Sequence, residues 1–407
     1  MSPCERIRVL ILTVMPSPYQ RELFEAMAAH PGLDVRVRYY TGSAPDRQWN
    51  RATLPSHSRI MPGFAVHSIA RCCCLNPSVL RELRAEPWDL VVVGDYFTLT
   101  AQVAMRYLTW HGVPWVLWGE APGIHARGRL GRWLRRRAQG PVRRAAAGIA
   151  AIGTRAVRAY RELVGPDVPV CNIPYHCDLS RYLAIPRPRD PRAASSGVRF
   201  LFSGQMIPRK GVDVLIRAFE QVCPRDSRAT LTLLGDGPRL SRYRQMVSAE
   251  WRDRVRFAGF RQSEDLPAIF AEADVFVLPS RYDGWGVVVN EALAAGMPIL
   301  ATSSVGAAAD LVVPGANGFV VPPGDAGALA GAMMRFVTEP SLVEAFGACS
   351  RRMAADWTVE RGAERWYELC QRVRRQGRRG SAVAADGTAG GAPVHLPGRP
   401  CGCGTRF

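Results

Sequence analysis

The sequence predicts an α/β protein of two doubly wound parallel-sheet domains that face each other across a central cleft. Short apolar runs of strand length alternate with segments of helical periodicity through most of the chain. This alternation is typical of parallel sheets covered by helices on both faces. The chain has 407 residues, 47% of them hydrophobic, which is enough for two domains with separate cores.

The first half of the chain contains five apolar runs that we interpret as strands, at 9–14, 35–40, 90–93, 116–118 and 149–152. The apolar stretch at 9–15, which contains the first run, could be mistaken for the apolar part of a signal peptide. It spans only seven residues, lacks a small-residue cleavage site and is followed by Pro16 and Pro18, so a buried strand is the better interpretation. No stretch approaches about 18 uninterrupted apolar residues, and the sequence therefore predicts no membrane-spanning helix.

The second half repeats the alternation more clearly. Apolar residues at 212, 215, 216, 219 and 222 fall on one helical face. Strands are expected at 198–203, 229–234, 255–260, 275–279 and 299–302, and helices at 212–222, 240–251, 266–273 and 287–295.

These elements define the expected domains. An N-terminal domain at 1–185 is followed by a linker at 186–197, whose prolines and small residues suit an exposed connection. The C-terminal domain is expected at 198–352 and a further helical segment at 353–375. Residues 376–407 are rich in glycine and poor in apolar residues, so we expect a disordered tail.

The chain is strongly basic, with 53 Lys and Arg residues against 35 Asp and Glu residues and a net charge of +18. The excess lies mainly in residues 1–200, which suggests that the first domain faces something anionic. Lys210 is the only lysine of the sequence. The 11 cysteines are odd in number and scattered, so we interpret them as reduced thiols of a cytoplasmic protein and not as zinc ligands.

One loop between a predicted strand and helix, at 279–287, carries acidic residues and glycines suited to a ligand. Asp283 stands at the carboxyl end of the strand and Glu291 in the first turns of the helix. Gly284 and Gly286 allow close approach of the backbone, and a helix N-terminus favours a diphosphate. A carboxylate can accept hydrogen bonds from a ribose diol or from sugar hydroxyls. The alternative is that Asp283 only forms a turn and Glu291 only stabilises its helix.

A second loop favours the ligand interpretation. Gly204 ends the first strand of the C-terminal domain, and the adjacent cations Arg209 and Lys210 precede its first helix, where phosphates would lie. A solvated loop would explain an Arg-Lys pair equally well, but this pair contains the single lysine of the chain. Gly235 lies in a third loop at the same sheet edge.

Residues 198–321 resemble the donor-binding domain of the family 4 glycosyltransferases of the GT-B fold. Residues 202–219 are similar to the family's G-x-x-x-x-x-K-G loop, 283–291 to its E-x7-E motif and 172–178 to its segment before the linker. Asp283 replaces the usual first glutamate and is one methylene shorter, so we expect it to alter the choice of sugar. The N-terminal loop Pro16–Tyr19 replaces the usual glycine pair, so acceptor contacts do not carry over.

The resemblance implies two Rossmann-like domains, a C-terminal helix that returns to the first domain, and transfer of a sugar from a UDP- or GDP-linked donor with retention of configuration. Arg209 and Lys210 would stabilise the departing diphosphate, with Asp283 at the sugar. The donor residues would be Gly204, Arg209, Lys210, Gly235, Asp283, Gly284, Gly286 and Glu291. No two aspartates are separated by one residue, so the metal-binding D-x-D motif is absent and we expect neither a metal nor another cofactor.

The acceptor is expected in the front domain, where related enzymes often place a histidine near the reacting carbon. Here the strand at 116–118 is followed by Glu120 and, one loop later, His125. Either could orient or deprotonate an acceptor hydroxyl. The alternatives are a helix-capping glutamate and a surface histidine.

Residues 121–161 hold eleven arginines and no acid, with Trp133 among Arg132, Arg135 and Arg136. A solvated helix in an arginine-rich protein is one interpretation. The other is a basic amphipathic helix on an anionic membrane, as a lipid-linked acceptor would require. This would place the protein at the inner face of the cell membrane, in surface polysaccharide synthesis. No motif for reading nucleic acid accompanies the charge, so we expect no nucleic-acid partner.

Two other functions remain open at this point. A GT-B nucleotide-sugar epimerase would convert the donor without an acceptor. A non-enzymatic basic protein that binds membranes or nucleic acid would not depend on Lys210. A pyridoxal-phosphate phosphorylase is disfavoured, because its Schiff base needs a lysine and Lys210 belongs to the phosphate loop.

Overall fold

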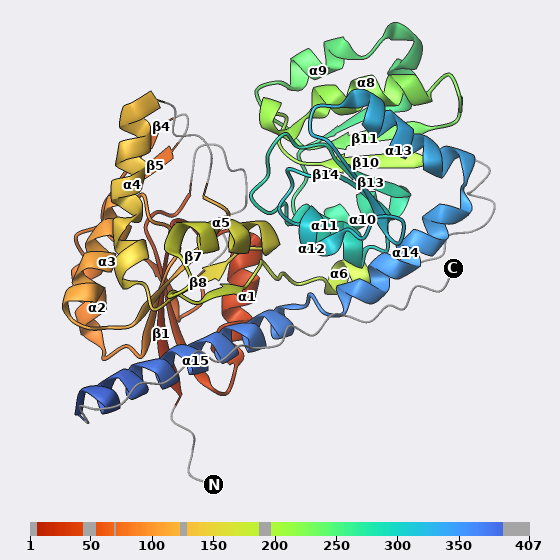
Figure 1. The fold of residues 1–407 in the computed structure, drawn as a ribbon. Helices are drawn as coiled ribbons and strands as arrows, with labels where there is room; N and C mark the ends of the chain where they lie inside the picture. The colour runs from red at the N-terminus through yellow and green to blue at the C-terminus, as the bar shows by residue number, and fades with distance from the viewer. Residues whose placement is uncertain (1–5, 44–53, 69–70, 123–127, 187–196, 386–407) are drawn as a thin grey trace.

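The computed structural model describes residues 6–43, 54–68, 71–122, 128–186 and 197–385. They form two α/β domains, each built on a parallel sheet, and a long C-terminal helix that joins them (Figure 1). The predicted fold class is confirmed. The predicted linker lies almost entirely outside the described residues, and so does the chain after residue 385.

The N-terminal sheet has seven strands in the order β3-β2-β1-β6-β7-β8-β9. Alternate side chains of β1 enter different cores, with Val9 and Ile11 on one face and Leu10 and Leu12 on the other. This explains why the first strand is apolar throughout. The strands are β1 Ile7–Thr13, β2 Leu33–Tyr39, β3 Ser58–Ile60, β6 Leu90–Val93, β7 Trp115–Gly119, β8 Gly148–Ala151 and β9 Val170–Asn172, and the helices are α1 Pro18–Ala29, α2 Val79–Ala85, α3 Leu99–Trp110, α4 Gly128–Ala145 and α5 Thr154–Val164.

The C-terminal sheet has six parallel strands in the order β12-β11-β10-β13-β14-β15. Its strands are β10 Arg199–Ser203, β11 Thr230–Leu234, β12 Val255–Gly259, β13 Val275–Leu278, β14 Ile299–Thr302 and β15 Gly318–Val321, and its helices are α8 Val212–Val222, α9 Leu240–Met246, α10 Leu266–Glu272, α11 Val288–Ala294, α12 Ala308–Leu311, α13 Ala326–Thr338 and α14 Ser341–Ala354. The strand order reverses between β10 and β13, so the loops after these two strands flank the position where ligands bind in doubly wound sheets.

The predictions about the elements were incomplete in two respects. The helix expected at 240–251 ends at Met246, because Val247 is extended and Ser248 binds the Glu220 carboxylate, and a 3₁₀ segment Ala249–Arg254 follows. The sequence also did not predict β3, β9, β15 or the antiparallel pair β4 Phe64–Ser68 and β5 Arg71–Leu75. All cysteines whose side chains are described are free thiols.

Helix α15, Val359–Ala385, returns to the N-terminal domain and lies along α1 (Figure 1). Trp366 packs against Trp118 with ring centroids 5.4 Å apart, and Tyr367 lies over Gly32, where a Cβ would be 2.3 Å from its ring. The expected return helix is therefore present. It continues ten residues beyond the predicted end at 375, so the tail expected from 376 begins too early.

The polypeptide crosses between the domains twice. The first crossing lies between β9 and the short helix α6, Ser180–Leu183, and the second between α14 and α15. The crossings touch, because the buried His176 ring stacks on Trp357 with centroids 5.4 Å apart and 18° between the planes. Within the described residues, no helix is long and apolar enough to span a membrane.

Candidate active site

Two cations and one carboxylate meet at the reversal point of the C-terminal sheet. Lys210 Nζ lies 2.5 Å from Asp283 Oδ2, and an Arg209 guanidinium nitrogen lies 3.2 Å from Asp283 Oδ1. Arg209 also donates to the carbonyl oxygen of Tyr282 at 2.9 Å. The sequence placed these three residues at the same sheet edge, and the structure brings them into contact.

Asp283 is buried, with 8% of its surface exposed. Burial acts to raise the pKa of its carboxyl, but the charges of Lys210 and Arg209 outweigh this effect and lower the pKa below its ordinary value. The carboxylate therefore stays ionised and holds both cations in place at neutral pH.

Glycines allow the loops around these charges to pack backbone against backbone. Gly211 has φ +71°, and a Cβ there would lie 2.1 Å from the Pro279 carbonyl oxygen. Gly235 has φ +126°, and its Cβ would lie 2.0 Å from the Gly204 carbonyl oxygen. A Cβ on Gly204 would in turn be 3.6 Å from Lys210 Cε. Gly204, Lys210 and Gly235 thus form one surface beside the ion pairs.

Glu291 lies away from these ion pairs. Among the described residues, no hydrogen bond or ion pair joins it to Asp283, Arg209 or Lys210. Its electrostatic neighbours are Arg181 and Glu22, with Tyr182 beside them. Burial, with a further contribution from Glu22, raises the pKa of Glu291 from 4.5 to about 7, against the opposing charge of Arg181. Glu291, which the sequence also assigned to donor binding, therefore has neighbours of its own, and its role in binding stays a prediction.

The raised pKa of Glu291 predicts a pH-dependent contribution to stability. Because the folded protein binds this proton more tightly than the unfolded chain, the contribution is full below pH 4.5 and is lost as the pH rises through about 7. The melting temperature of Glu291→Gln minus that of the parent protein should therefore increase as the pH is raised from 5 to 8. A difference that is constant over this range, measured by calorimetry, would contradict the assignment.

Glu120 reaches, from the N-terminal domain, the loop at 279–287, which we call the donor loop. It follows β7, and its carboxylate lies directly against Gly284, where a Cβ would be 1.6 Å from Glu120 Oε2. Its negative charge contributes, after burial, to the raised pKa values of Tyr160, Tyr175 and Tyr282. Glu120 thus contacts, from the other domain, the residue that follows Asp283 in the chain. The other acceptor-side candidate, His125, lies outside the described residues.

The basic helix α4 runs along the outer side of the N-terminal domain, near β4 and β5 (Figure 1). Arg132 and Arg136 are exposed, and Trp133 is 53% exposed with the Arg137 guanidinium over its ring. Arg135 differs from them, because it is only half exposed and its guanidinium is 3.5 Å from the Pro122 carbonyl oxygen. Leu130 and Leu134 extend the exposed apolar face of the helix.

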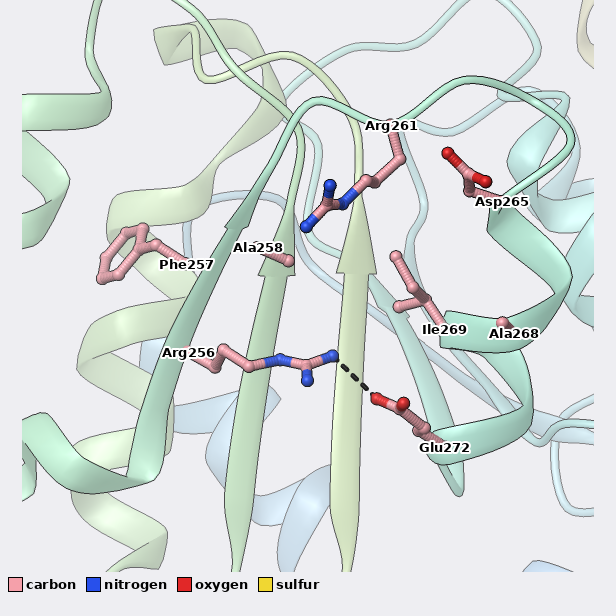
Figure 2. A pocket seen from close by; sticks show the side chains of 8 residues that line it. All are labelled: Arg256, Phe257, Ala258, Arg261, Asp265, Ala268, Ile269 and Glu272. Carbon is pink, nitrogen blue, oxygen red and sulfur yellow. Dashed lines mark hydrogen bonds and ion pairs between the residues drawn. The ribbon is translucent and has the colours of Figure 1, made fainter.

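An open pocket of about 540 Å³ lies between β12 and α10 (Figure 2). Arg256 and Arg261 both extend into it, and Arg256 pairs with Glu272 at 2.8 Å on the helix side. The pocket contains none of the residues expected at the site, and β12 is separated from β10 by β11. Within the described residues, no group of three or more His, Cys, Asp or Glu side chains could hold a metal ion.

Comparison with known proteins assigns the C-terminal domain. Residues 188–353 match the family model of "Glycosyl transferases group 1". The C-terminal domain belongs to the group 1 glycosyltransferases. The resemblance inferred from the motifs is thereby confirmed. This domain supports the expectation that the protein is an enzyme of the glycosyltransferase class.

Sequence relatives match about half of this chain. A GDP-mannose-dependent alpha-(1-6)-phosphatidylinositol monomannoside mannosyltransferase of Mycolicibacterium smegmatis is 31% identical over 218 residues, covering 50% of this chain and 57% of that protein. The exopolysaccharide phosphotransferase SCO2592 of Streptomyces coelicolor is 33% identical over 219 residues, which is 51% of this chain and 23% of that protein. The chain thus spans about half the length of the mannosyltransferase and less of the phosphotransferase.

Solved structures resemble both domains together. Anabaena Alr3699/HepE, in complex with UDP, superposes with a TM-score of 0.70 at 19% identity over 90% of this chain and 100% of that chain. Sucrose-phosphate synthase of Thermosynechococcus elongatus gives a TM-score of 0.71 at 21% identity, over 91% and 100% of the two chains. The group 1 domain is therefore one half of a GT-B fold, as the resemblance implied.

Proposed function

We propose that this protein is a retaining, metal-independent glycosyltransferase that moves a sugar from a UDP- or GDP-linked donor to a glycan or lipid-linked acceptor. The observation that carries the proposal is the meeting of Arg209, Lys210 and Asp283 at the sheet's reversal point, with Glu120 of the other domain against the neighbouring Gly284. The group 1 domain and the GT-B fold support it.

The arrangement suits expulsion of a nucleoside diphosphate. In the reaction the bond between the anomeric carbon and the diphosphate oxygen breaks, and the negative charge that develops on the oxygen needs fixed cations. Lys210 and Arg209 can supply these cations. A bound diphosphate would compete with Asp283 for both of them. Asp283 would then accept hydrogen bonds from sugar hydroxyls, and Glu120 would orient the acceptor hydroxyl and take its proton. Retention of configuration follows from the family resemblance.

This function can be tested with a panel of nucleoside diphosphates and nucleotide sugars. We expect one base and one sugar to raise the melting temperature, because a ligand that binds only the folded protein stabilises it. The stabilising nucleotide sugar should donate its sugar to a glycan or lipid-linked acceptor, and EDTA should leave the rate unchanged. Activity that is lost in EDTA and restored by a divalent ion would contradict metal independence. Conversion of the donor without an acceptor would indicate an epimerase.

We further propose that α4 places the enzyme on an anionic membrane, as a peripheral protein of the inner face of the cell membrane that acts in surface polysaccharide synthesis. The helix combines exposed arginines with the exposed apolar side chains of Leu130, Trp133 and Leu134. Such a surface suits the boundary between lipid headgroups and acyl chains. The names of the two relatives, which act on a phosphatidylinositol mannoside and an exopolysaccharide, are compatible with this role.

Sedimentation with vesicles tests the membrane proposal. Replacing Arg132 and Arg136 together by glutamine should weaken binding to vesicles rich in phosphatidylglycerol by roughly 30-fold, at about 1 kcal/mol per cation. Trp110→Ala is the control, because Trp110 is 87% exposed on α3 and lies outside the basic helix. Equal binding of the parent protein to neutral phosphatidylcholine vesicles would contradict the electrostatic attraction.

A further inference from the structure

We propose that Asp310 is a positioning residue: from the C-terminal domain it caps helix α5 of the N-terminal domain and so holds Glu120 over the donor loop. The assignment rests on the proposed function for its catalytic consequence. The contacts themselves are independent of it. Asp310 lies in the short helix α12, which the sequence analysis did not single out.

The Asp310 carboxylate accepts three hydrogen bonds, all from the other domain. Its Oδ2 is 2.9 Å from the Thr154 backbone nitrogen, and its Oδ1 is 2.8 Å from Thr154 Oγ1 and 3.0 Å from Asn172 Nδ2. Asn172 in turn accepts from the Gly153 backbone nitrogen at 3.1 Å through its Oδ1. Both oxygens are therefore used across the domain boundary.

The contact replaces a cap that α5 lacks. Gly153 is the N-cap residue and has no side chain, so the first backbone N–H groups of the helix receive no local acceptor. A carboxylate satisfies the N–H of Thr154 and also carries the charge that a helix N-terminus favours. The end of this helix is thus completed only when the two domains are together.

Asp310 is connected to the donor loop through backbone hydrogen bonds. The Asp283 nitrogen donates to the Ser304 carbonyl oxygen at 3.1 Å, and the Gly306 nitrogen donates to the Asp283 carbonyl oxygen at 3.0 Å. The Ala307 nitrogen donates to the Trp285 carbonyl oxygen at 2.9 Å, immediately before α12 begins. The donor loop and α12 are therefore one connected unit.

Three neighbouring contacts join this unit to the N-terminal domain. Asp310 binds Thr154, the Trp285 ring lies over Gly153, where a Cβ would be 2.6 Å from it, and Gly284 lies under Glu120. We call these three contacts the interdomain seam. Because all three connect the same two units, loosening the Asp310 contact should let Glu120 move away from the donor loop.

The test compares Asp310→Ala and Asp310→Asn with Asp325→Ala. Asp325 caps α13 through the Ala328 nitrogen at 2.8 Å, entirely inside the C-terminal domain, so it controls for the loss of a helix cap without a change at the seam. The readouts are kcat, the KM of the donor, small-angle X-ray scattering with and without UDP or GDP, and amide exchange in the first turn of α5.

We expect Asp310→Ala to lower kcat by about 10- to 100-fold, since a displacement of about 1 Å in an active site can have such an effect. The KM of the donor should stay within about threefold, because the Lys210–Asp283 pair lies within one domain. The radius of gyration should increase and α5 amide exchange should accelerate, with Asp310→Asn intermediate. Asp325→Ala should change neither scattering nor α5 exchange.

Scattering and exchange also separate this proposal from the proposed function. Unchanged scattering and unchanged α5 exchange in Asp310→Ala would overturn the positioning role, whether or not sugar transfer is found. A variant with a larger radius of gyration and faster α5 amide exchange, but with the parent kcat, would overturn the catalytic consequence. If the parent protein transferred no sugar from any donor, the proposed function would fail, while the two physical readouts would still decide whether Asp310 holds the seam.

Discussion

Replacing Lys210 by alanine is expected to lower kcat/KM for sugar transfer by about 10²- to 10³-fold, the loss typical of removing one group that stabilises developing negative charge. The Lys210 side chain is only 12% exposed, so its charge acts in surroundings from which water is largely excluded. After the substitution, Asp283 would keep only Arg209, whose side chain is 38% exposed. The remaining carboxylate would also repel a diphosphate.

Two further variants make the Lys210 measurement specific. Lys210→Arg keeps the charge on a larger, planar group and should recover part of the rate. Arg217→Ala removes an exposed cation from α8 that pairs with Asp213, four residues earlier on the same helix. Its kcat/KM should stay within about twofold of the parent value. A Lys210→Ala enzyme within threefold of the parent rate would exclude the proposed role of this lysine.

Gly284→Ala is expected to lower kcat by about 10²-fold, because the added methyl group would displace the Glu120 carboxylate from its place over the loop. The new methyl group would lie 1.6 Å from Glu120 Oε2, a separation that real atoms do not adopt, so either the carboxylate or the whole domain must move. Binding of UDP or GDP should persist, since the Lys210–Asp283 pair lies within the C-terminal domain and does not involve the Glu120 side chain.

A second glycine in the same domain provides the control. Gly331 lies in α13, and a Cβ there meets nothing within 4 Å among the described residues, so Gly331→Ala should leave transfer unchanged. Wild-type transfer by Gly284→Ala would show that the observed contact of Glu120 is not part of the active arrangement. Loss of nucleotide binding would show instead that the loop itself is damaged.

The sequence was informative where functional residues follow the carboxyl ends of predicted strands. Lys210 follows a strand that pairs with the strand before Asp283, so the periodicity of two neighbouring strands was sufficient to predict that they meet. For Glu291 the sequence predicted the place in the first turn of its helix but not the neighbouring charges, because Arg181 and Glu22 belong to other parts of the chain.

The interdomain seam could not be predicted from the sequence for a similar reason. Asp310 binds Thr154 across 156 positions, and neither residue belongs to a motif. The Arg256–Arg261 pocket was also missed, since its side chains come from an edge strand and a helix whose relative placement the periodicity does not fix. The exposure of α4 could be predicted, but not that Arg135 turns towards Pro122.

The stacking of His176 on Trp357 has a consequence for the motion that any substrate exchange requires. The two stretches of chain that connect the domains are packed against each other at these rings, so they act together as a single hinge pin. We therefore expect any change in the angle between the domains to bend both stretches at this stack. Burial and the charge of Arg365 lower the pKa of His176 to about 4, so the stack keeps a neutral ring at physiological pH and the axis of rotation does not depend on its titration.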